Sequence, residues 1–375
     1  MAKTSFVPNP AKIKVMGLGG GGCNAVTRMV QEELQGVDFI GVNTDAQALL
    51  LTEAPTRIQI GEKMTRGLGV GGDHRLGGKA AEQSRDELRE AIGDADMVFL
   101  AAGMGGGTGT GTIPFVAELS KETGALTIAV VTKPFTFEGT HRMQVAEAGI
   151  ENLIGKVDTL IIIPNDRLLT LCDNKTAVSN AFRMADDALR HGVQAIAEVI
   201  TVPGLINLDF ADVRAVMKDA GPAWMSVGIG SGQNRAANAA TAALDSPLLD
   251  VSVDGAKGVL FNIAGGNNLT LFEVNEAAQV IREAVDPEAN IIFGVVYDSK
   301  LDADVRITLI CTGFTSVRPD GPKIRKDEEL RHLLEGPDSE HQLDVPTFLR
   351  RPSPRRQAME AMEPKKSGLR ARLKV

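Results

Sequence analysis

The sequence predicts an α/β fold in which short buried strands alternate with helices and form a doubly wound parallel sheet. The strand candidates are apolar runs without polar alternation, which is typical of strands that are buried on both faces. In such a sheet, ligands bind beyond the carboxyl ends of the strands. The predicted strands are Ile13–Met16, Phe39–Asn43, Met97–Ala102, Thr127–Thr132 and Thr159–Ile163. The predicted helices between them are Asn24–Gln35, Ser84–Ala91, Ile113–Glu122 and His141–Ile154.

A long helix is predicted to follow over Thr176–Ile200. Apolar residues recur there at steps of three and four, which gives one buried stripe, and Pro203 with Gly204 ends the pattern. The stripe consists of Phe182, Ala185, Leu189, Val193, Ile196 and Ile200. A smaller α+β domain is expected beyond it, with strands at Val259–Ala264, Ile291–Val296 and Val305–Cys311 and helices at Arg235–Leu244 and Val274–Ala284.

The composition is that of a soluble globular protein. Of 375 residues, 43% are hydrophobic and 23% are charged, which is ordinary for that class. No apolar run approaches the roughly 20 residues that cross a bilayer, and the first residues lack a signal-peptide core. Three widely separated cysteines, Cys23, Cys172 and Cys311, form no metal or disulfide pattern. We therefore expect a protein of the reducing cytoplasm.

Charge is unevenly distributed along the chain. The net charge is −8, but residues 350–375 hold nine Lys or Arg against two Glu, so residues 1–349 carry −15. An acidic body of this kind is not expected to bind nucleic acid. After about Thr315 the apolar periodicity stops, which predicts a flexible linker over 315–343, interrupted by a short apolar island at Asp344–Leu349.

The first glycine-rich loop, GLGGGGCNAV (17–26), lies between a predicted strand and a predicted helix. It contains G-x-G-x-x-G, which suits both a tight turn without a ligand and a dinucleotide site. A dinucleotide site needs an acidic residue at the end of the second strand, where this chain has Asn43, with Asp45 beyond it. Nothing matches a Walker A loop, because Ala80 follows Lys79 where a hydroxyl is required.

The second loop, GMGGGTGTG (103–111), is a stronger signal. Five glycines in the seven residues from Gly105 to Gly111 cost too much backbone entropy to serve a simple turn. They suit a concave anion site lined with backbone N–H groups, to which Thr108 and Thr110 would add hydroxyl donors. Two such loops at neighbouring strand ends predict a site that holds one polyphosphate from both sides.

These loops resemble those of the tubulin/FtsZ superfamily, and in detail those of the bacterial FtsZ family. The match covers about residues 11–314 and continues through several further motifs, in order. They are NTDAQAL (43–49), GLGVGGD (67–73), TKPFTFEG (132–139), IPNDRLL (163–169), FRMADDAL (182–189) and NLDFADVR (207–214). The resemblance implies a GTPase that self-assembles head to tail into filaments and organises the division ring, with GTP or GDP and Mg²⁺ as cofactors.

The resemblance also implies roles for particular residues. Glu138 would contact the ribose and Arg142 the terminal phosphate, although by spacing alone this pair is a surface salt bridge. Asn165 would hold ribose and base, while Phe182, which the pattern alone places in the core, would lie beside guanine. Asp186 would accept hydrogen bonds from guanine N1–H and N2–H, and the sequence does not exclude Asp187. The implied GTP contacts are Gly19, Gly20, Gly21, Gly22, Cys23, Asn24, Asn43, Thr44, Asp45, Gly71, Gly72, Gly103, Gly105, Gly106, Gly107, Thr108, Gly109, Thr132, Pro134, Glu138, Arg142, Asn165, Phe182 and Asp186.

Asp209 and Asp212 stand three apart at a predicted helix start, a spacing that by itself favours helix capping. They follow the long helix, so they are expected far from the glycine loops of the same molecule. The resemblance implies that they are catalytic and complete the site of a neighbouring subunit, where they polarise the attacking water. A head-to-tail contact that does not close produces filaments.

The C-terminal region carries two further expectations. Asp344–Arg351 resembles the peptide by which FtsZ proteins dock on membrane-anchoring division proteins. The basic tail would bind acidic lipid or an acidic neighbouring filament, or it is simply solvated; charge does not decide between these. The expected location is the cytoplasm, at midcell beneath the inner membrane. The expected domains are an N-terminal arm (1–10), a GTP-binding domain (11–175), a central helix (176–202), a C-terminal activation domain (203–314), a flexible linker (315–343), a docking peptide (344–351) and a basic tail (352–375).

Three other functions fit parts of the sequence. A dehydrogenase would use the first loop for NAD, a tubulin-like filament protein would serve shape control or plasmid partition, and a non-catalytic module would bind GTP without hydrolysis. The terminal peptide argues against the second, and Asp209 and Asp212 argue against the third.

Overall fold

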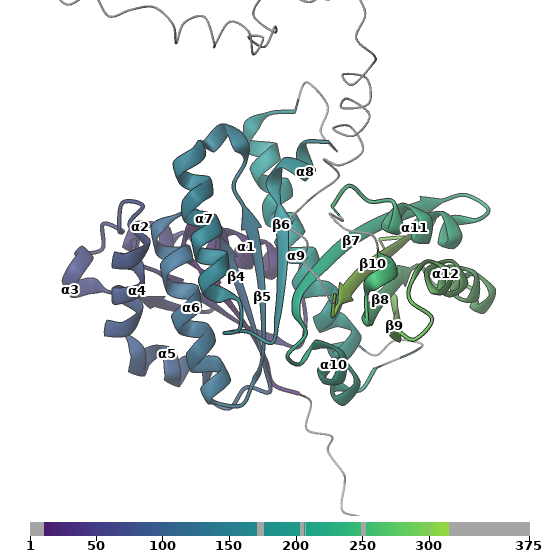
Figure 1. Ribbon diagram of the computed structural model, residues 1–375, viewed down its shortest axis with the longest axis horizontal. Coiled ribbons are helices and arrows are strands. Elements are labelled where there is room, and N and C mark those ends of the chain that lie inside the picture. Colours follow the sequence, from purple (N-terminus) through teal and green to yellow (C-terminus); the bar gives the residue numbers. More distant parts are fainter. Residues whose placement is uncertain are drawn as a thin grey trace, which may run out of the picture. The chain divides into compact units, whose positions relative to one another are not determined.

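The computed structural model describes residues 11–170, 176–202, 206, 208–248, 253–298 and 300–314 (Figure 1). Its strands form one ten-stranded sheet, in the order β3-β2-β1-β4-β5-β6-β7-β10-β8-β9. The strands are β1 (Ile13–Leu18), β2 (Val37–Asn43), β3 (Thr56–Gln59), β4 (Met97–Gly103), β5 (Leu126–Lys133), β6 (Thr159–Pro164), β7 (Gly221–Ser231), β8 (Gly258–Gly265), β9 (Asn290–Tyr297) and β10 (Asp304–Thr312).

Helices connect these strands throughout the described residues. The α-helices are α1 (Gly19–Gln31), α2 (Ala46–Leu50), α3 (Glu62–Thr65), α4 (His74–Gln83), α5 (Arg85–Ile92), α6 (Gly107–Glu122), α7 (Thr140–Leu153), α8 (Asn165–Leu169), α9 (Val178–Thr201), α10 (Phe210–Met217), α11 (Arg235–Leu244) and α12 (Leu271–Ala284). Two short 3₁₀ helices are η1 (Thr136–Glu138) and η2 (Val253–Gly255). None of the helices in the described part of the chain is long and apolar enough to span a bilayer.

The sheet is parallel from β3 to β7. Strand β10 runs antiparallel to both β7 and β8, while β8 and β9 are parallel. The predicted α/β fold is therefore confirmed: a parallel half carries the glycine loops, and a smaller mixed half follows the long helix α9. Because β1 to β6 are parallel, their carboxyl ends meet at one edge of the sheet, where ligands of this fold class bind.

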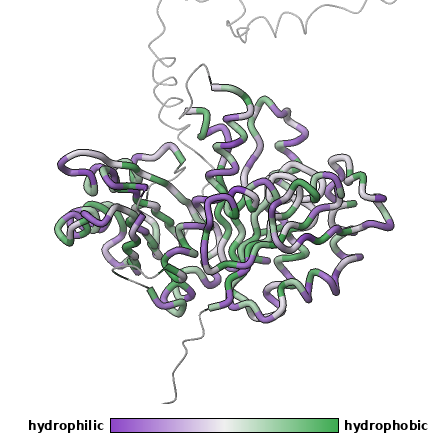
Figure 2. Tube along the Cα trace, turned by 180° about the vertical axis from the view of Figure 1, so that it is seen from behind, coloured by the Kyte–Doolittle hydropathy of each residue, from purple (hydrophilic) through white to green (hydrophobic). Residues whose placement is uncertain are grey.

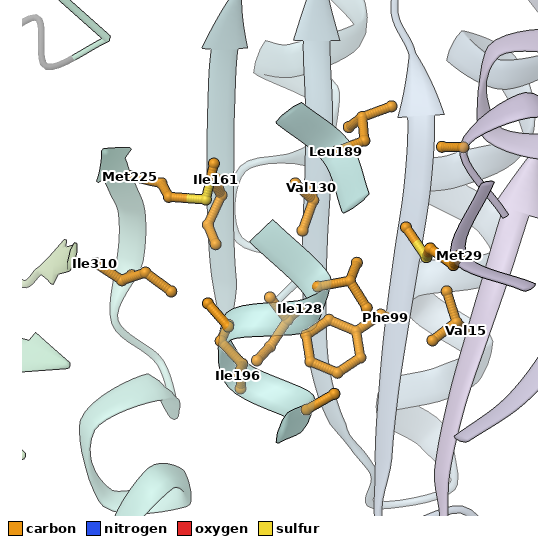
Figure 3. Close-up of a cluster of buried hydrophobic side chains, with 14 of the residues drawn as sticks. Val15, Met29, Phe99, Ile128, Val130, Ile161, Leu189, Ile196, Met225 and Ile310 are labelled. Atoms are coloured by element: carbon orange, nitrogen blue, oxygen red, sulfur yellow. The ribbon is translucent and has the colours of Figure 1, made fainter. Parts of the chain in front are cut away.

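Two apolar cores cover the two faces of the parallel half. On one face, α1 and α9 pack against the strands through residues such as Met29, Phe99 and Leu189, as Figure 3 shows. On the other face, α4 to α7 cover side chains that include Met16, Leu100 and Val131 (Figure 1). The strands are apolar on both faces, as the sequence predicts, and Figure 2 shows hydrophobic residues concentrated along them.

The smaller half has its own core, in which α11 and α12 pack on β8 and β10. Strand β7, which sequence patterning misses, crosses from one half to the other. Its apolar run is broken by glycines because α11 lies directly on it: a Cβ on Gly228 would come 2.1 Å from the Ala239 carbonyl oxygen, and one on Gly230 would come 2.0 Å from that of Arg235. The glycines that obscure the strand pattern are thus needed for the helix to approach.

The long helix is confirmed as α9, a helix of 24 residues. Four members of its predicted stripe, Ala185, Leu189, Val193 and Ile196, are buried. Phe182 is different: it is 40% exposed, so the pattern-based assignment of this side chain to the core is wrong. It lies in the first two turns of α9, where its ring packs edge-on against Phe135 and part of it stays open to a ligand.

Candidate nucleotide site

The two glycine loops lie side by side at the carboxyl ends of β1 and β4. Helix α1 begins at Gly19 and helix α6 at Gly107, each directly after its strand. The loops touch, because a Cβ on Gly19 would come 2.7 Å from the backbone nitrogen of Gly109. Two helix N-termini, with their unpaired N–H groups and positive dipole ends, therefore converge on one place, which suits a polyphosphate.

Two groups can be distinguished among the glycines of these loops and of the GLGVGGD segment (67–73). Gly17 and Gly22 are packed against backbone, and a Cβ on Gly22 would lie 2.2 Å from the carbonyl oxygen of Ala101. These glycines allow the chain to fold. In the second group an added Cβ would meet no atom within 4 Å, so these residues face open space. This group includes Gly20, Gly71, Gly72 and Gly106.

A cleft of 760 Å³ opens beside the second group. It is lined by Gly71, Gly72 and Gly105–Gly107, and also by side chains at the starts of α4 and α7. Asp73 caps α4 by accepting hydrogen bonds from the backbone N–H groups of Arg75 and Leu76. The basic lining, which favours an anion, consists of His74, Arg75, His141 and Arg142.

Sequence analysis finds only Arg142 among these basic residues. A capping Asp followed by His and Arg, directly after the GGD motif, is the signal that could have indicated His74 and Arg75. His141 could have been found from its place next to Arg142. The rest of α4 is obscured by its glycines, since a Cβ on Gly77 would come 2.3 Å from the carbonyl oxygen of Gly107 on α6.

The hydroxyls of the second loop are used within the protein. Thr108 Oγ1 lies 2.7 Å from Thr44 Oγ1, and both side chains are buried. Thr110 Oγ1 accepts a hydrogen bond from the Gly105 backbone N–H at 2.9 Å, and its side chain is buried. At the end of β2, Asn43 Oδ1 accepts a hydrogen bond from the N–H of Asp45. These hydrogen bonds fix the shape of the loops.

Glu138 and Arg142 form the ion pair that their spacing predicts, with Arg142 Nη1 3.1 Å from Glu138 Oε2. Glu138 is nearly buried, and its other oxygen accepts from the Phe135 backbone N–H at 2.8 Å. Arg142 is half exposed and lies against the second loop, where a Cβ on Gly105 would come 2.7 Å from its carbonyl oxygen. This arrangement holds the guanidinium beside the cleft.

Three aromatic rings gather near the start of α9. Phe135 and Phe137 stack with centroids 4.9 Å apart, and Phe182 meets Phe135 edge-on at 5.5 Å. Phe137 and Phe182 are partly exposed, so they offer an apolar surface to a planar ligand. Asp166 accepts hydrogen bonds from the N–H and hydroxyl of Thr136 and so holds the loop that carries Phe135 and Phe137.

Asn165 is the first residue of α8, directly after the carboxyl end of β6. It is 5% exposed, and its Oδ1 has no hydrogen-bond partner in the described structure. A buried acceptor without a donor is costly unless a ligand or water satisfies it. The ribose and base contact expected of Asn165 would supply that donor.

Asp186 is the more buried of the two adjacent carboxylates on α9. Its Oδ2 lies 3.4 Å from Arg28 Nε of α1. Burial raises the pKa of Asp186 to about 6, against the opposing effect of Arg28 and with a contribution from the charge of Asp187. Asp187 is more exposed and pairs with Arg190 at 3.5 Å. The geometry therefore favours Asp186 over Asp187 as the acceptor that faces a base.

The other expected contacts line the same edge of the sheet. Cys23 is buried, and burial raises the pKa of its thiol to about 11, so its position near a helix N-terminus does not activate it. Asn24 is exposed one turn into α1, and Thr132 is buried, with its carbonyl accepting the Met104 N–H at 2.9 Å. The remaining residues, which lie in these loops or next to them, are Gly21, Gly103, Pro134 and Gly109.

Asp209 and Asp212 stand apart from this group. Both are exposed at the start of α10. Asp209 makes no capping hydrogen bond, so the capping interpretation of their spacing is wrong. Neither side chain forms a hydrogen bond or ion pair with another described residue, which leaves two free carboxylates on the surface.

Helix α10 lies at the edge of the sheet opposite the glycine loops (Figure 1). Thr159 at the start of β6 donates a hydrogen bond to the carbonyl of Met217 at the end of α10. Arg214 of α10 likewise donates to the carbonyl of Gly124, just before β5. Since β5 and β6 end at the nucleotide edge, these contacts place α10 at their amino ends.

The fold and the site together define a nucleotide-binding α/β protein with two glycine loops, an exposed aromatic surface and a basic cleft. Comparison with protein families agrees with this. Residues 12–173 match the GTPase domain of the Tubulin/FtsZ family, and residues 221–315 match the C-terminal domain of the FtsZ family. The chain belongs to the FtsZ family and is a filament-forming GTPase of cell division.

Solved structures support the same assignment. The FtsZ dimer of M. jannaschii is 47% identical over 81% of this chain and 89% of its own, with a TM-score of 0.79. A mutant of the same protein matches equally well, over 92% of its length. The fold is shared with CetZ2 from Haloferax volcanii, a GTPγS-bound protofilament, at 20% identity and a TM-score of 0.69 over 86% of this chain and 98% of that one.

Proposed function

We propose that GTP lies across the carboxyl edge of the sheet, with its triphosphate over the open glycines and its guanine at the aromatic rings. The observation that carries this is where the open glycines lie: Gly71, Gly72 and Gly106, at which an added Cβ would meet no atom within 4 Å, line the cleft, whereas Gly17 and Gly22, which are packed on backbone, do not. Phe182 would contact the guanine ring, Asp186 would accept from N1–H and N2–H, and Asn165 would find its missing donor. Arg142 would reach the terminal phosphate.

We further propose that hydrolysis occurs between two subunits. Asp209 and Asp212 would serve the nucleotide of the next molecule, because α10 and the glycine loops lie at opposite edges of the sheet. A water oriented by these carboxylates attacks the γ-phosphorus, the bond to the β-phosphate oxygen breaks, and a carboxylate takes the water proton. The relatives in a dimer and a protofilament are consistent with end-to-end stacking.

Mg²⁺ would enter with the nucleotide. The described residues hold no group of three or more His, Cys, Asp or Glu side chains placed to bind a metal ion. Mg²⁺ commonly takes phosphate oxygens and water instead of a protein cage, and it would neutralise charge on the β- and γ-phosphates.

The proposals for the C-terminal region concern residues outside the described structure. Asp344–Arg351 would dock on a membrane-anchoring division protein, and the basic tail would contact acidic lipid or a neighbouring filament. In the cell the filaments would then gather at midcell beneath the membrane.

Phosphate release measured against protein concentration, with light scattering alongside, tests the shared site. Specific activity should be close to zero below an assembly threshold and rise steeply above it. A constant specific activity at all concentrations would contradict hydrolysis between subunits.

The Asp212→Ala variant tests the catalytic assignment separately. It should bind GTP and assemble like the wild type, yet hydrolyse roughly 100-fold more slowly per polymerised subunit. Loss of GTP binding in this variant would mean that Asp212 takes part in nucleotide binding, and the catalytic assignment would be wrong. Lys218→Ala, an exposed change just after the same helix, is the matched control and should retain full activity.

A further inference from the structure

The end of α10 is attached to the GTPase half of its own subunit by a cluster of charged side chains. Lys121, in the last turn of α6, places its Nζ 3.3 Å from Asp158 Oδ1 and 3.3 Å from Asp219 Oδ1. Asp158 lies just before β6, and Asp219 lies two residues after α10. Lys121 thus links the parallel sheet to the segment that follows α10, the helix at whose start Asp209 and Asp212 lie.

The cluster is anchored in the protein interior. Asp158 is 4% exposed, and its other oxygen accepts the Thr127 backbone N–H at 2.8 Å. Its carbonyl also accepts the N–H of Gly221, the first residue of β7. Burial opposes protonation of Lys121, but the charge of Asp158 and the hydrogen bonds of both carboxylates outweigh it and raise its pKa. Asp158 is therefore a buried carboxylate in a fixed position, and it holds the Lys121 ammonium in place.

Asp219 has an unusual backbone conformation. Its φ is 50°, in the left-handed region that residues other than glycine rarely adopt. Such a conformation costs about 1 kcal/mol or more and persists only where surrounding contacts maintain it. The contact between Asp219 and Lys121 is one that does so. The ion pair of the Asp219 side chain with Lys121 therefore stabilises a turn after α10 that the Asp219 backbone disfavours.

The lysine belongs to the helix that begins at the phosphate loop. Helix α6 starts at Gly107, beside the cleft, and reaches Lys121 one residue before its end. Its 16 residues span about 24 Å, which is most of the depth of the parallel sheet. Helix α6 therefore contacts the subunit's own nucleotide cleft at one end and, through Lys121, the segment that follows α10 at the other.

We infer that Lys121 is a positioning residue for GTP hydrolysis: through Asp158 and Asp219 it fixes α10, so that Asp209 and Asp212 meet the nucleotide of the adjacent subunit. This inference rests on the proposed function. Position matters because reacting groups lose much of their effect when displaced by about 1 Å. Without the lysine, Asp158 keeps a buried charge with no cation, and the strained turn at Asp219 relaxes. The carboxylates then stay attached to the chain but lose their fixed place.

The test is the hydrolysis rate per polymerised subunit in the full chain, with GTP affinity and assembly measured in parallel. Lys121→Met should retain GTP affinity, KM and the assembly threshold within about twofold, while kcat falls roughly tenfold. Lys121→Arg should restore kcat to within about twofold, because a guanidinium reaches both carboxylates. A wild-type kcat in Lys121→Met, or no recovery in Lys121→Arg, would overturn the inference.

A double-mutant cycle separates positioning from a general structural effect. If Lys121 acts only through the carboxylates of α10, adding Lys121→Met to a variant that lacks both of them, Asp209→Ala/Asp212→Ala, should not slow hydrolysis further. A further tenfold loss on adding Lys121→Met to that variant would show that Lys121 acts independently of these carboxylates and would overturn the inference. The cycle also separates it from the proposed function: normal hydrolysis in Asp212→Ala alone refutes the shared site, whereas a slow Asp212→Ala beside a normal Lys121→Met refutes only the role of Lys121.

Two further variants guard against loss of folding. Asp219→Gly removes the contact with Lys121 but relieves the left-handed strain, so the protein should fold while kcat falls in the same way. Unchanged kcat in Asp219→Gly would count against the inference. Lys156→Met is the matched control, because Lys156 also pairs with a residue of α6, Glu118 at 3.0 Å, and has nearly the same exposure, but its ion pair does not involve Asp158 or Asp219. It should leave kcat unchanged.

Discussion

Thr44 and Thr108 share a hydrogen bond of 2.7 Å between their hydroxyl oxygens, buried where β2 ends and α6 begins. This contact ties the second glycine loop to the end of β2, which is separated from β4 by β1 in the sheet. Thr108→Val keeps the shape but leaves the Thr44 hydroxyl buried without a partner, which should destabilise the fold by about 1–3 kcal/mol. Thermal unfolding measures this, and GTP affinity should fall as the loop loosens.

The double variant Thr44→Val/Thr108→Val is the control for that prediction. Removing both hydroxyls leaves no unsatisfied group, so stability should recover to within about 1 kcal/mol of the wild type. If the double variant is less stable than Thr108→Val, the hydroxyl pair is not the interaction that holds the junction.

The glycines offer a second prediction, because packing and ligand binding require different ones. Gly20→Ala and Gly106→Ala add a methyl group into open space, so both proteins should unfold at the wild-type temperature. Their GTP affinity should fall by at least about tenfold, since the methyl group occupies the proposed path of the phosphates. Circular dichroism melting and nucleotide titration measure the two effects.

Gly22→Ala should behave in the opposite way. Its Cβ would lie 2.2 Å from the Ala101 carbonyl oxygen, so the backbone must shift and stability should fall by several kcal/mol, of the order seen for overpacking. Equal thermal stability of Gly22→Ala and Gly106→Ala would contradict the division of the glycines into packed and open groups.

The fold could be predicted from sequence wherever burial alone selects the residues. Strands β1, β4, β5 and β6 are continuous apolar runs because both of their faces are covered, and α9 shows a clear stripe. Strand β7 and helix α4 were not predicted because a neighbouring helix packs so closely on each of them that only glycine fits, and glycine weakens the local apolar pattern. Their positions are a property of packing between distant segments, which no local pattern contains.

The same distinction applies to the site. The glycine loops are a local signal, so sequence analysis places them. The basic side chains of His74 and His141 meet only because α4 and α7 flank the same cleft. The spacing of Asp209 and Asp212 suggests capping, and only the structure shows that Asp209 makes no capping hydrogen bond. The sequence could not predict that His74 and His141 line one cleft, because tertiary structure brings them together. It also could not predict that Asp209 makes no capping hydrogen bond.

A pH effect is expected from Asp186, whose pKa burial raises to about 6. In the unfolded chain this carboxyl ionises near 3.8, so between about pH 4 and 6 the folded state holds a proton that the unfolded state has lost. Its contribution therefore lowers stability as pH rises through that window. Guanine donors need the ionised form, so GTP affinity should fall about tenfold per pH unit below 6.

Asp186→Asn and Arg28→Gln test this effect from two sides. The Asn variant should lose that part of the pH dependence and prefer xanthosine triphosphate, whose O2 accepts from the amide where guanine donates. Removing Arg28 takes away the cation 3.4 Å from Asp186, so the inflection should move to higher pH. Titration of GTP, GDP and ATP at each pH separates this from ionisation of the γ-phosphate.

Arg142 should distinguish GTP from GDP. It holds the nearly buried Glu138 in an ion pair and faces the cleft, so we expect it near the terminal phosphate. Arg142→Met should weaken GTP binding about tenfold or more, while GDP affinity changes little, because the lost charge-assisted hydrogen bonds concern the γ-phosphate alone. Arg142→Lys keeps the charge without the planar fork and should give an intermediate loss. Equal losses for GTP and GDP would place Arg142 at the ribose or the inner phosphates and return the γ-phosphate to His74, Arg75 or His141 on the cleft wall.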